Sequence, residues 1–164
     1  YRRQRQMCIR DRYKLCAVEK DGRIIPKINL SENVRKITIP SSKLVYRLFD
    51  MDSGKAIADV LTTDSEEIDD SKPYELFDPD FTWKRKEIEN FVARPLLVKI
   101  FDKGTCVYAS PTLPEIREYC AEQIDTLWDE VKRFENPHKY YVDLSEKLWE
   151  IRKLLIEEYK GVRK

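Results

Sequence analysis

Glycine is scarce in this sequence: Gly22, Gly54, Gly104 and Gly161 are the only four in 164 residues. Proteins that bind phosphate groups usually bring several glycines to the ligand, because a bare backbone lets several N–H groups point at one anion. Three of these glycines lie in predicted hairpin turns, and Gly161 lies near a predicted helix end. No glycine remains for a phosphate loop, and the dinucleotide-binding, Walker A and nucleophile-elbow patterns are absent.

Histidine and cysteine are also few. His138 is the single histidine, and the four cysteines, at positions 8, 16, 106 and 120, form no C-x-x-C pair. This spacing argues against a zinc site and a disulfide framework, and scattered thiols are typical of a reducing cytoplasm. We interpret His138 as a loop or capping residue, with a ligand or interface contact as the alternative. The sequence therefore assigns no catalytic residue and no metal ligand, and it leaves the substrate-binding residues unknown.

Long hydrophobic runs are missing, since none approaches the ~20 residues that span a bilayer. The formal charge is +1, but residues 1–12 hold five arginines and one aspartate, whereas the other 152 residues hold 26 basic and 29 acidic side chains. A nucleic-acid interface usually needs a continuous basic stripe, which is absent after residue 12. We therefore predict no membrane and no nucleic-acid partner. A nucleic-acid binder is the alternative that depends on the opening arginines alone.

The opening itself, "RQRQMCIRDR", resembles translated sequencing-adapter sequence. We interpret residues 1–12 as non-native and expect the natural sequence to start near Tyr13, inside a coding region. A genuine basic arm is the alternative. On the first interpretation the chain is a C-terminal fragment of a longer protein.

Strand hairpins are predicted in the first two thirds of the chain. Asp21-Gly22 signals a turn between "YKLCAVE" and "IIPKINL", Gly54 a turn between "KLVYRLFD" and "KAIADVLTT", and Gly104 a bend within 94–110. Pro95 indicates a strand start or an edge. The acidic stretch at 63–72 is predicted to be a solvated loop, with a cation site as the alternative.

Helical periodicity begins at Thr112. Capping-box spacing occurs at Thr112–Glu115 and again at Asp143–Glu146. One apolar stripe covers 116–134, a second covers 144–155, and Gly161 is a predicted C-cap. Burial of a dozen apolar side chains does not offset the entropy of ordering the two helices. We therefore expect the helical pair to dock on a sheet or on another subunit.

Aromatic and basic side chains meet at "FTWKRKEIE". We predict that Lys84, Arg85 and Lys86 form a solvated edge beside Trp83, with an anion site as the alternative. The three tryptophans are far apart in the sequence and are interpreted as packing anchors. They are Trp83, Trp128 and Trp149.

A family resemblance is carried by five segments whose order and spacing fit together over some 140 residues. They are "YKLCAVEKDGRIIPKINLSENVRKITIP", "KLVYRLFDMDSGKAIADV", "ELFDPDFTWKRK", "RPLLVKIFDKG" and "TLWDEVKRFENPHKYYVDLSEKLWEIR". Together they resemble the C-terminal part of a bacterial nicotinate phosphoribosyltransferase of the longer form.

The resemblance implies an α+β fragment of a type II phosphoribosyltransferase. Residues 13–40 would form the end of an irregular α/β barrel in the catalytic domain, and 41–110 part of a β-rich domain. Residues 111–164 would form a C-terminal helical region. One departure is Asn29-Leu30-Ser31, where relatives usually show Lys-(Ile/Leu)-Ser; if that lysine holds an anion, Lys27 is the alternative source of its charge.

The resemblance implies the activity of a glycosyltransferase that acts in the biosynthesis of pyridine nucleotides and NAD. The transfer is coupled to ATP hydrolysis, as in a ligase. Nicotinate attacks phosphoribosyl pyrophosphate and forms nicotinate mononucleotide, with Mg²⁺ and ATP as cofactors of a cytoplasmic homodimer. In the family the phosphorylated histidine and the phosphate loops lie upstream of this region, and His138 does not take that role. We expect the fragment alone to bind no cofactor and to be inactive. A stand-alone interaction module without catalysis is the alternative.

Overall fold

The computed structural model describes residues 14–32 and 36–162, and the chain divides into two compact units. One unit is formed by residues 43–147. The other combines the described residues of the range 14–42 with residues 148–162. The interpretation of residues 1–12 as non-native lies outside the described residues.

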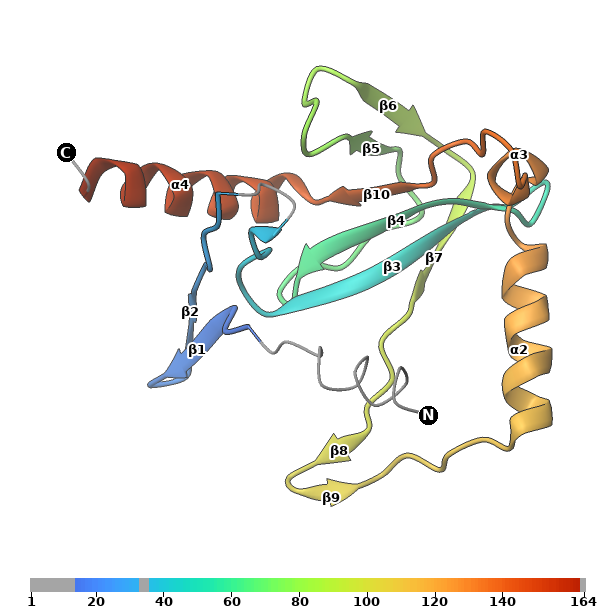
Figure 1. Ribbon diagram of the computed structural model, residues 1–164, viewed down its shortest axis with the longest axis horizontal. Helices are drawn as coiled ribbons and strands as arrows, with labels where there is room; N and C mark the ends of the chain where they lie inside the picture. The colour runs from blue at the N-terminus through green and yellow to red at the C-terminus, as the bar shows by residue number, and fades with distance from the viewer. Residues whose placement is uncertain (1–13, 33–35, 163–164) are drawn as a thin grey trace. The chain divides into compact units, whose positions relative to one another are not determined.

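A four-stranded sheet forms the centre of the 43–147 unit (Figure 1). Its strands lie in the order β10-β4-β3-β7; β3 is antiparallel to β4 and β7, and β10 is parallel to β4. These strands are β3 (Lys43–Asp50), β4 (Ala56–Thr63), β7 (Phe91–Pro95) and β10 (Tyr141–Leu144). A mainly antiparallel sheet whose helices lie in separate segments of the chain belongs to the α+β class, as the sequence predicts.

Alternation along β3 and β4 produces one apolar face. Tyr46 is directly opposite Val60, and Leu48 is directly opposite Ala58. A hairpin of β5 (Tyr74–Phe77) and β6 (Arg85–Ile88) adds further apolar side chains to this face. The resulting core consists of Tyr46, Leu48, Ala58, Val60, Leu76, Ile88 and Phe91.

The predicted turns are confirmed. Asp21 and Gly22 both have positive φ and join β1 (Ala17–Lys20) to β2 (Arg23–Pro26), which is the geometry of a type I′ turn. In the β3–β4 turn, the carboxylate of Asp50 accepts hydrogen bonds from the backbone N–H of Asp52 and Ser53. Such local bonds replace the ladder bonds that end at the turn.

The third predicted strand pair is shorter than expected. Only β8 (Phe101–Asp102) and β9 (Thr105–Cys106) pair, around Gly104. Arg94 and Pro95 belong instead to β7, where they face Arg47 and Tyr46 across the ladder to β3. Pro95 is thus the last residue of an edge strand, where its missing N–H removes no ladder bond from the interior.

Three strands are not predicted from the sequence. β5 and β6 lie around the basic segment that was interpreted only as a solvated edge, and β10 follows the predicted helix break. Strand β10 has just four residues and becomes a strand by pairing with β4, from Tyr141↔Ala58 to Leu144↔Leu61. Such short segments carry little local signal, so the partner strand decides their conformation.

The predicted helix over 116–134 is wrong in extent. Helix α2 (Leu113–Asp125) ends before a short α3 (Asp129–Lys132), because Thr126 turns its carbonyl to the N–H of Ala56 at the start of β4. The capping box at the start of α2 is confirmed, since the Glu115 carboxylate accepts hydrogen bonds from the backbone N–H and hydroxyl of Thr112.

The second capping box is wrong. Asp143 is a buried residue of β10, and α4 (Glu146–Val162) begins directly after Ser145. Leu144, expected in the second helical stripe, also lies in β10, and Leu154 of that stripe is exposed. Gly161 lies inside α4 and is not its C-cap. Among the described helices, none has the length and apolar character needed to cross a membrane.

Several residues expected to be buried are exposed. Trp83 is 75% exposed and Trp128 is 42% exposed, so the packing-anchor interpretation is wrong for both within this chain. Cys106 and Cys120 are exposed free thiols. Helix α2 buries none of its side chains, so its apolar stripe is not covered by the residues that the structure describes.

Leu48→Ala should lower the free energy of unfolding by about 2–5 kcal/mol, because Leu48 is fully buried at the centre of the sheet. Val98→Ala is the matched control, since Val98 is 64% exposed and its truncation should change stability by less than about 0.5 kcal/mol. Urea unfolding followed by circular dichroism measures both. Equal losses in the two variants would contradict this core.

Candidate functional site

Two clusters of charged side chains lie at the four-stranded sheet. The first, here called the ion-pair cluster, consists of Arg47, Asp59, Tyr140 and Gln123. Arg47 of β3 and Asp59 of β4 are directly opposite each other, on the face away from the apolar core. Two parallel hydrogen bonds join them, Nε to Oδ1 at 2.8 Å and Nη2 to Oδ2 at 2.9 Å.

Tyr140 and Gln123 complete the ion-pair cluster. The Tyr140 hydroxyl donates to Asp59 Oδ1 at 2.9 Å, and the Arg47 guanidinium carbon lies 5.8 Å from the centre of the Tyr140 ring. Arg47 Nη1 also donates to Gln123 Oε1 of α2 at 3.5 Å. Because Gln123 comes from α2, the cluster ties the C-terminal half of this helix to the sheet.

Electrostatics keep Arg47 and Tyr140 each in one protonation state. The hydrogen bond to Asp59 raises the pKa of Arg47 above its usual value. Burial and the negative charge of Asp59 raise the pKa of Tyr140. Arg47 is therefore a fixed cation and Tyr140 a neutral phenol, and neither is poised to transfer a proton near neutral pH.

A groove of about 470 Å³ opens between the ion-pair cluster and α2. Its remaining lining is mainly apolar and consists of Ile116, Tyr119, Cys120, Ile124, Leu127 and Val131. The charged side chains at this groove already bond to one another. The groove thus offers a packing surface rather than reactive groups.

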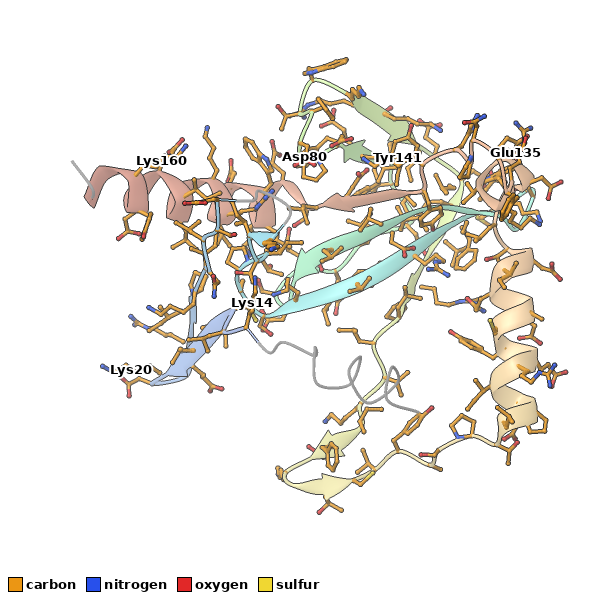
Figure 2. The ribbon with its side chains drawn as sticks, viewed as in Figure 1. Lys14, Lys20, Asp80, Glu135, Tyr141 and Lys160 are labelled. Carbon is orange, nitrogen blue, oxygen red and sulfur yellow. The ribbon has the colours of Figure 1, made fainter. Side chains whose placement is uncertain are left out.

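The second cluster, here called the Asp143 pocket, lies between β10 and the β5–β6 hairpin and has a volume of about 290 Å³. Figure 2 labels Tyr141, which lies on β10 and lines this pocket. The full lining is Ile57, Leu76, Phe77, Asp78, Lys84, Arg85, Lys86, Tyr141 and Asp143.

Two carboxylates in the Asp143 pocket have opposite environments. Asp78 accepts hydrogen bonds from the backbone N–H of Asp80 and Phe81 and from Lys139 Nζ at 3.4 Å. Burial opposes ionisation of Asp78, but these bonds prevail and lower its pKa. Asp143 accepts no hydrogen bond from any described residue, and burial together with the charge of Asp78 raises its pKa to about 6.

The predicted solvated edge is confirmed, because Lys84, Arg85 and Lys86 are all exposed on or beside strand β6. Arg85 forms an ion pair with Glu75 on the neighbouring strand. The ammonium of Lys84 lies 4.6 Å from the centre of the Phe81 ring. These side chains also form part of the Asp143 pocket, which the sequence did not suggest.

The other residues singled out in the sequence are not brought together. His138 is an exposed loop residue whose backbone N–H donates to the carbonyl of Glu130. Asn29 is exposed in the other unit, where its backbone N–H donates to Thr38 Oγ1 at 2.8 Å. The acidic stretch is a loop as predicted, and Glu66 within it accepts hydrogen bonds from Thr63 and Ser145. The described residues contain no group of three potential metal ligands.

Sequence reasoning missed both clusters, although a signal for the first was present. Once Gly54 marks the turn, alternation places Arg47 and Asp59 on the polar face of two neighbouring strands, where opposite charges pair. No comparable signal existed for Asp143, because β10 was not recognised.

The comparisons with known proteins agree with this architecture. Residues 42–152 match the family model of the nicotinate phosphoribosyltransferase C-terminal domain. The chain belongs to the nicotinate phosphoribosyltransferase family. The matched range contains the whole 43–147 unit, and so both clusters lie in the family's C-terminal domain.

Individual relatives cover most of this chain. It is 36% identical to the nicotinate phosphoribosyltransferase of Bacillus subtilis over 149 residues, and 33% identical to that of Dictyostelium discoideum over 146 residues. The crystal structure of human nicotinic acid phosphoribosyltransferase superimposes on 73% of the chain with a TM-score of 0.65 and 25% identity. These matches confirm the resemblance and the α+β fold.

The chain is much shorter than these relatives. It spans 30% of the Bacillus subtilis protein, 24% of the Dictyostelium discoideum protein and 24% of the human chain, while 91%, 84% and 73% of its own length are covered. Most of each relative therefore has no counterpart in the present sequence.

Asp59→Ala should lower the free energy of unfolding by about 2–4 kcal/mol, because it leaves the largely buried Arg47 without its counter-ion. The double variant Arg47→Met/Asp59→Leu should be less destabilised than Asp59→Ala, because neither charge remains. Urea unfolding of these variants and of Arg47→Met measures the coupling. A double variant at least as unstable as Asp59→Ala would contradict the argument.

Asp143→Asn should become more stable relative to the wild type as the pH rises from about 4 to 7. The folded state holds a proton on Asp143 up to about pH 6, whereas the unfolded state releases it near pH 4, so ionisation destabilises the fold in this window. The difference in unfolding free energy between the variant and the wild type should grow by roughly 1–2 kcal/mol. The effect is limited to this size because the carboxylate opens onto a pocket, where solvent weakens the penalty of its charge. Exposed Asp80→Asn is the matched control, and equal pH slopes in denaturant unfolding of both variants would contradict the assignment.

Proposed function

We propose that this chain acts as the C-terminal part of a nicotinate phosphoribosyltransferase. The complete enzyme would join nicotinate to phosphoribosyl pyrophosphate and release nicotinate mononucleotide and pyrophosphate, with ATP hydrolysis, in the salvage of NAD. The observation that carries this proposal is the 36% identity to the Bacillus subtilis enzyme over 91% of the chain. A cytoplasmic homodimer is part of the proposal.

The described residues favour a supporting role over a catalytic one. Gly22, Gly54 and Gly104 all have positive φ in hairpin turns, and the single histidine, His138, is an exposed loop residue. The described residues contain no group of three metal-binding side chains. We therefore assign substrate, Mg²⁺ and ATP binding to the rest of the enzyme.

Exposed apolar surface supports the same role. Helix α2 exposes Leu113, Ile116, Tyr119 and Ile124, and the segment from residue 97 to 107 exposes Leu97, Val98, Ile100, Phe101 and Val107. Surface of this kind marks contacts with other protein. In the proposed enzyme these faces would pack on the barrel or on the second subunit.

A chimera tests the proposal. Residues 13–164 of this chain would replace the matched 30% of the Bacillus subtilis enzyme, and nicotinate-dependent pyrophosphate release would be measured. We expect activity from the chimera, and none from the present chain alone. Turnover by the chain alone, or a folded dimeric chimera without turnover, would contradict the proposal.

Within the chimera, Ile116→Asp should reduce activity about tenfold or more, because it places a charge on the apolar face of α2. Arg117→Asp introduces the same side chain on the next residue of α2 and should retain activity. Equal effects of the two substitutions would argue against a packing role for this face.

The second candidate is a stand-alone interaction module, favoured by the uncovered stripe of α2. It predicts a cooperatively melting, monodisperse monomer. The proposed enzyme part predicts instead that the isolated chain self-associates and binds a dye specific for apolar surface. Analytical ultracentrifugation separates these outcomes.

A further inference from the structure

Asp143 combines deep burial with the absence of a hydrogen-bond partner among the described residues. It is 4% exposed, and it lines a pocket of about 290 Å³. A buried carboxylate without a donor is costly, because it loses hydration and gains nothing in return. Its neighbour Asp78 is equally buried but accepts three hydrogen bonds. Asp143 is therefore the carboxylate of this pocket that lacks a hydrogen-bond donor among the described residues, and Lys139 acts on it only through its charge.

The basic side chains nearby are mostly engaged elsewhere. Lys139 bonds to Asp78, Arg85 pairs with Glu75, and Lys84 lies over aromatic rings. Lys86 also lines the pocket and forms no ion pair with a described residue. We expect its flexible ammonium to compete with a bound cation for Asp143, and this makes it useful in the test below.

The walls of the pocket favour an amphipathic ligand. Ile57, Leu76, Phe77 and Tyr141 supply apolar surface beside the two carboxylates. The volume is near the lower end of the range found for small-molecule sites. A short alkyl stem could lie against these side chains while a charged head reaches Asp143.

We propose that the Asp143 pocket binds a small organic cation, an alkylammonium or guanidinium group on a short apolar stem, through a charge-assisted hydrogen bond to Asp143. Such bonds are stronger than neutral ones and suit a carboxylate of a buried residue that opens onto a pocket. The cation can come from a free amine or from a lysine or arginine of the longer enzyme. The site lies within the 43–147 unit and does not depend on phosphoribosyl transfer.

The pH dependence of binding follows from the surroundings of Asp143. The charged and titratable groups around the pocket are Asp78, Lys139, Tyr74, Tyr141, Lys84, Arg85 and Lys86. Asp78 and burial raise the pKa of Asp143 to about 6, so the empty site is largely ionised at pH 7.5 and largely neutral at pH 5. Cation binding should therefore weaken on acidification and release protons.

Agmatine, which carries a guanidinium and an ammonium at the two ends of a four-carbon chain, is the probe for the test. Its binding to the 164-residue chain would be followed at pH 7.5 and low salt by amide chemical shifts, up to about 10 mM ligand. We expect saturable binding that Asp143→Asn weakens at least tenfold and that Asp80→Asn leaves unchanged. Lys86→Met should tighten binding by removing the internal competitor, and it provides a second test if Asp143→Asn fails to fold.

Absence of saturable binding to the wild type, or equal binding by Asp143→Asn, would overturn the proposal. An unchanged affinity at pH 5 would overturn it as well. Repeating the titration on the chimera described above distinguishes the two sources of the cation. Retained agmatine binding in the chimera indicates a free amine, whereas loss of agmatine binding there indicates that a basic side chain of the enzyme fills the pocket.

Discussion

The pairing of β3 with β4 is the constraint on which the rest of the 43–147 unit depends. Its register places Leu48 beside Ala58 on one face and Arg47 beside Asp59 on the other. A shift of one residue would exchange the two faces and bury the charged pair in the core. The bidentate ion pair and the apolar core therefore support the same register from opposite sides of the sheet.

Both outer strands of the sheet depend on this hairpin. β7 pairs with β3 and β10 pairs with β4, so each is held by one central strand. Strand β10 also carries Asp143 and lies beside Tyr140, which places one member of each cluster at the same edge of the sheet. The short segment 140–143 thus connects the ion-pair cluster to the Asp143 pocket through adjacent residues.

The distribution of apolar side chains is consistent with a part of a larger enzyme. The sheet and the β5–β6 hairpin bury a compact core, whereas α2 buries none of its side chains. The charged groups of the ion-pair cluster bond to one another and to Tyr140. Under the proposed function, the C-terminal part would provide stable surfaces, and the chemistry would be located in the rest of the enzyme.

The sequence by itself determined the features that depend on neighbours along the chain. These are the hairpin turns at Asp21-Gly22 and Gly54 and the capping box of α2, because turn and cap geometry is set within a few residues. The family resemblance was also readable from the order of the segments along the chain. Only the tertiary structure decided that β10 is a strand, that α2 ends at Asp125, and that Asp143 is a buried carboxylate beside Asp78. In each case the residues that decide the structure lie far away in the sequence, on β4 or on the β5–β6 hairpin. Local sequence patterns do not show which distant residues will become neighbours.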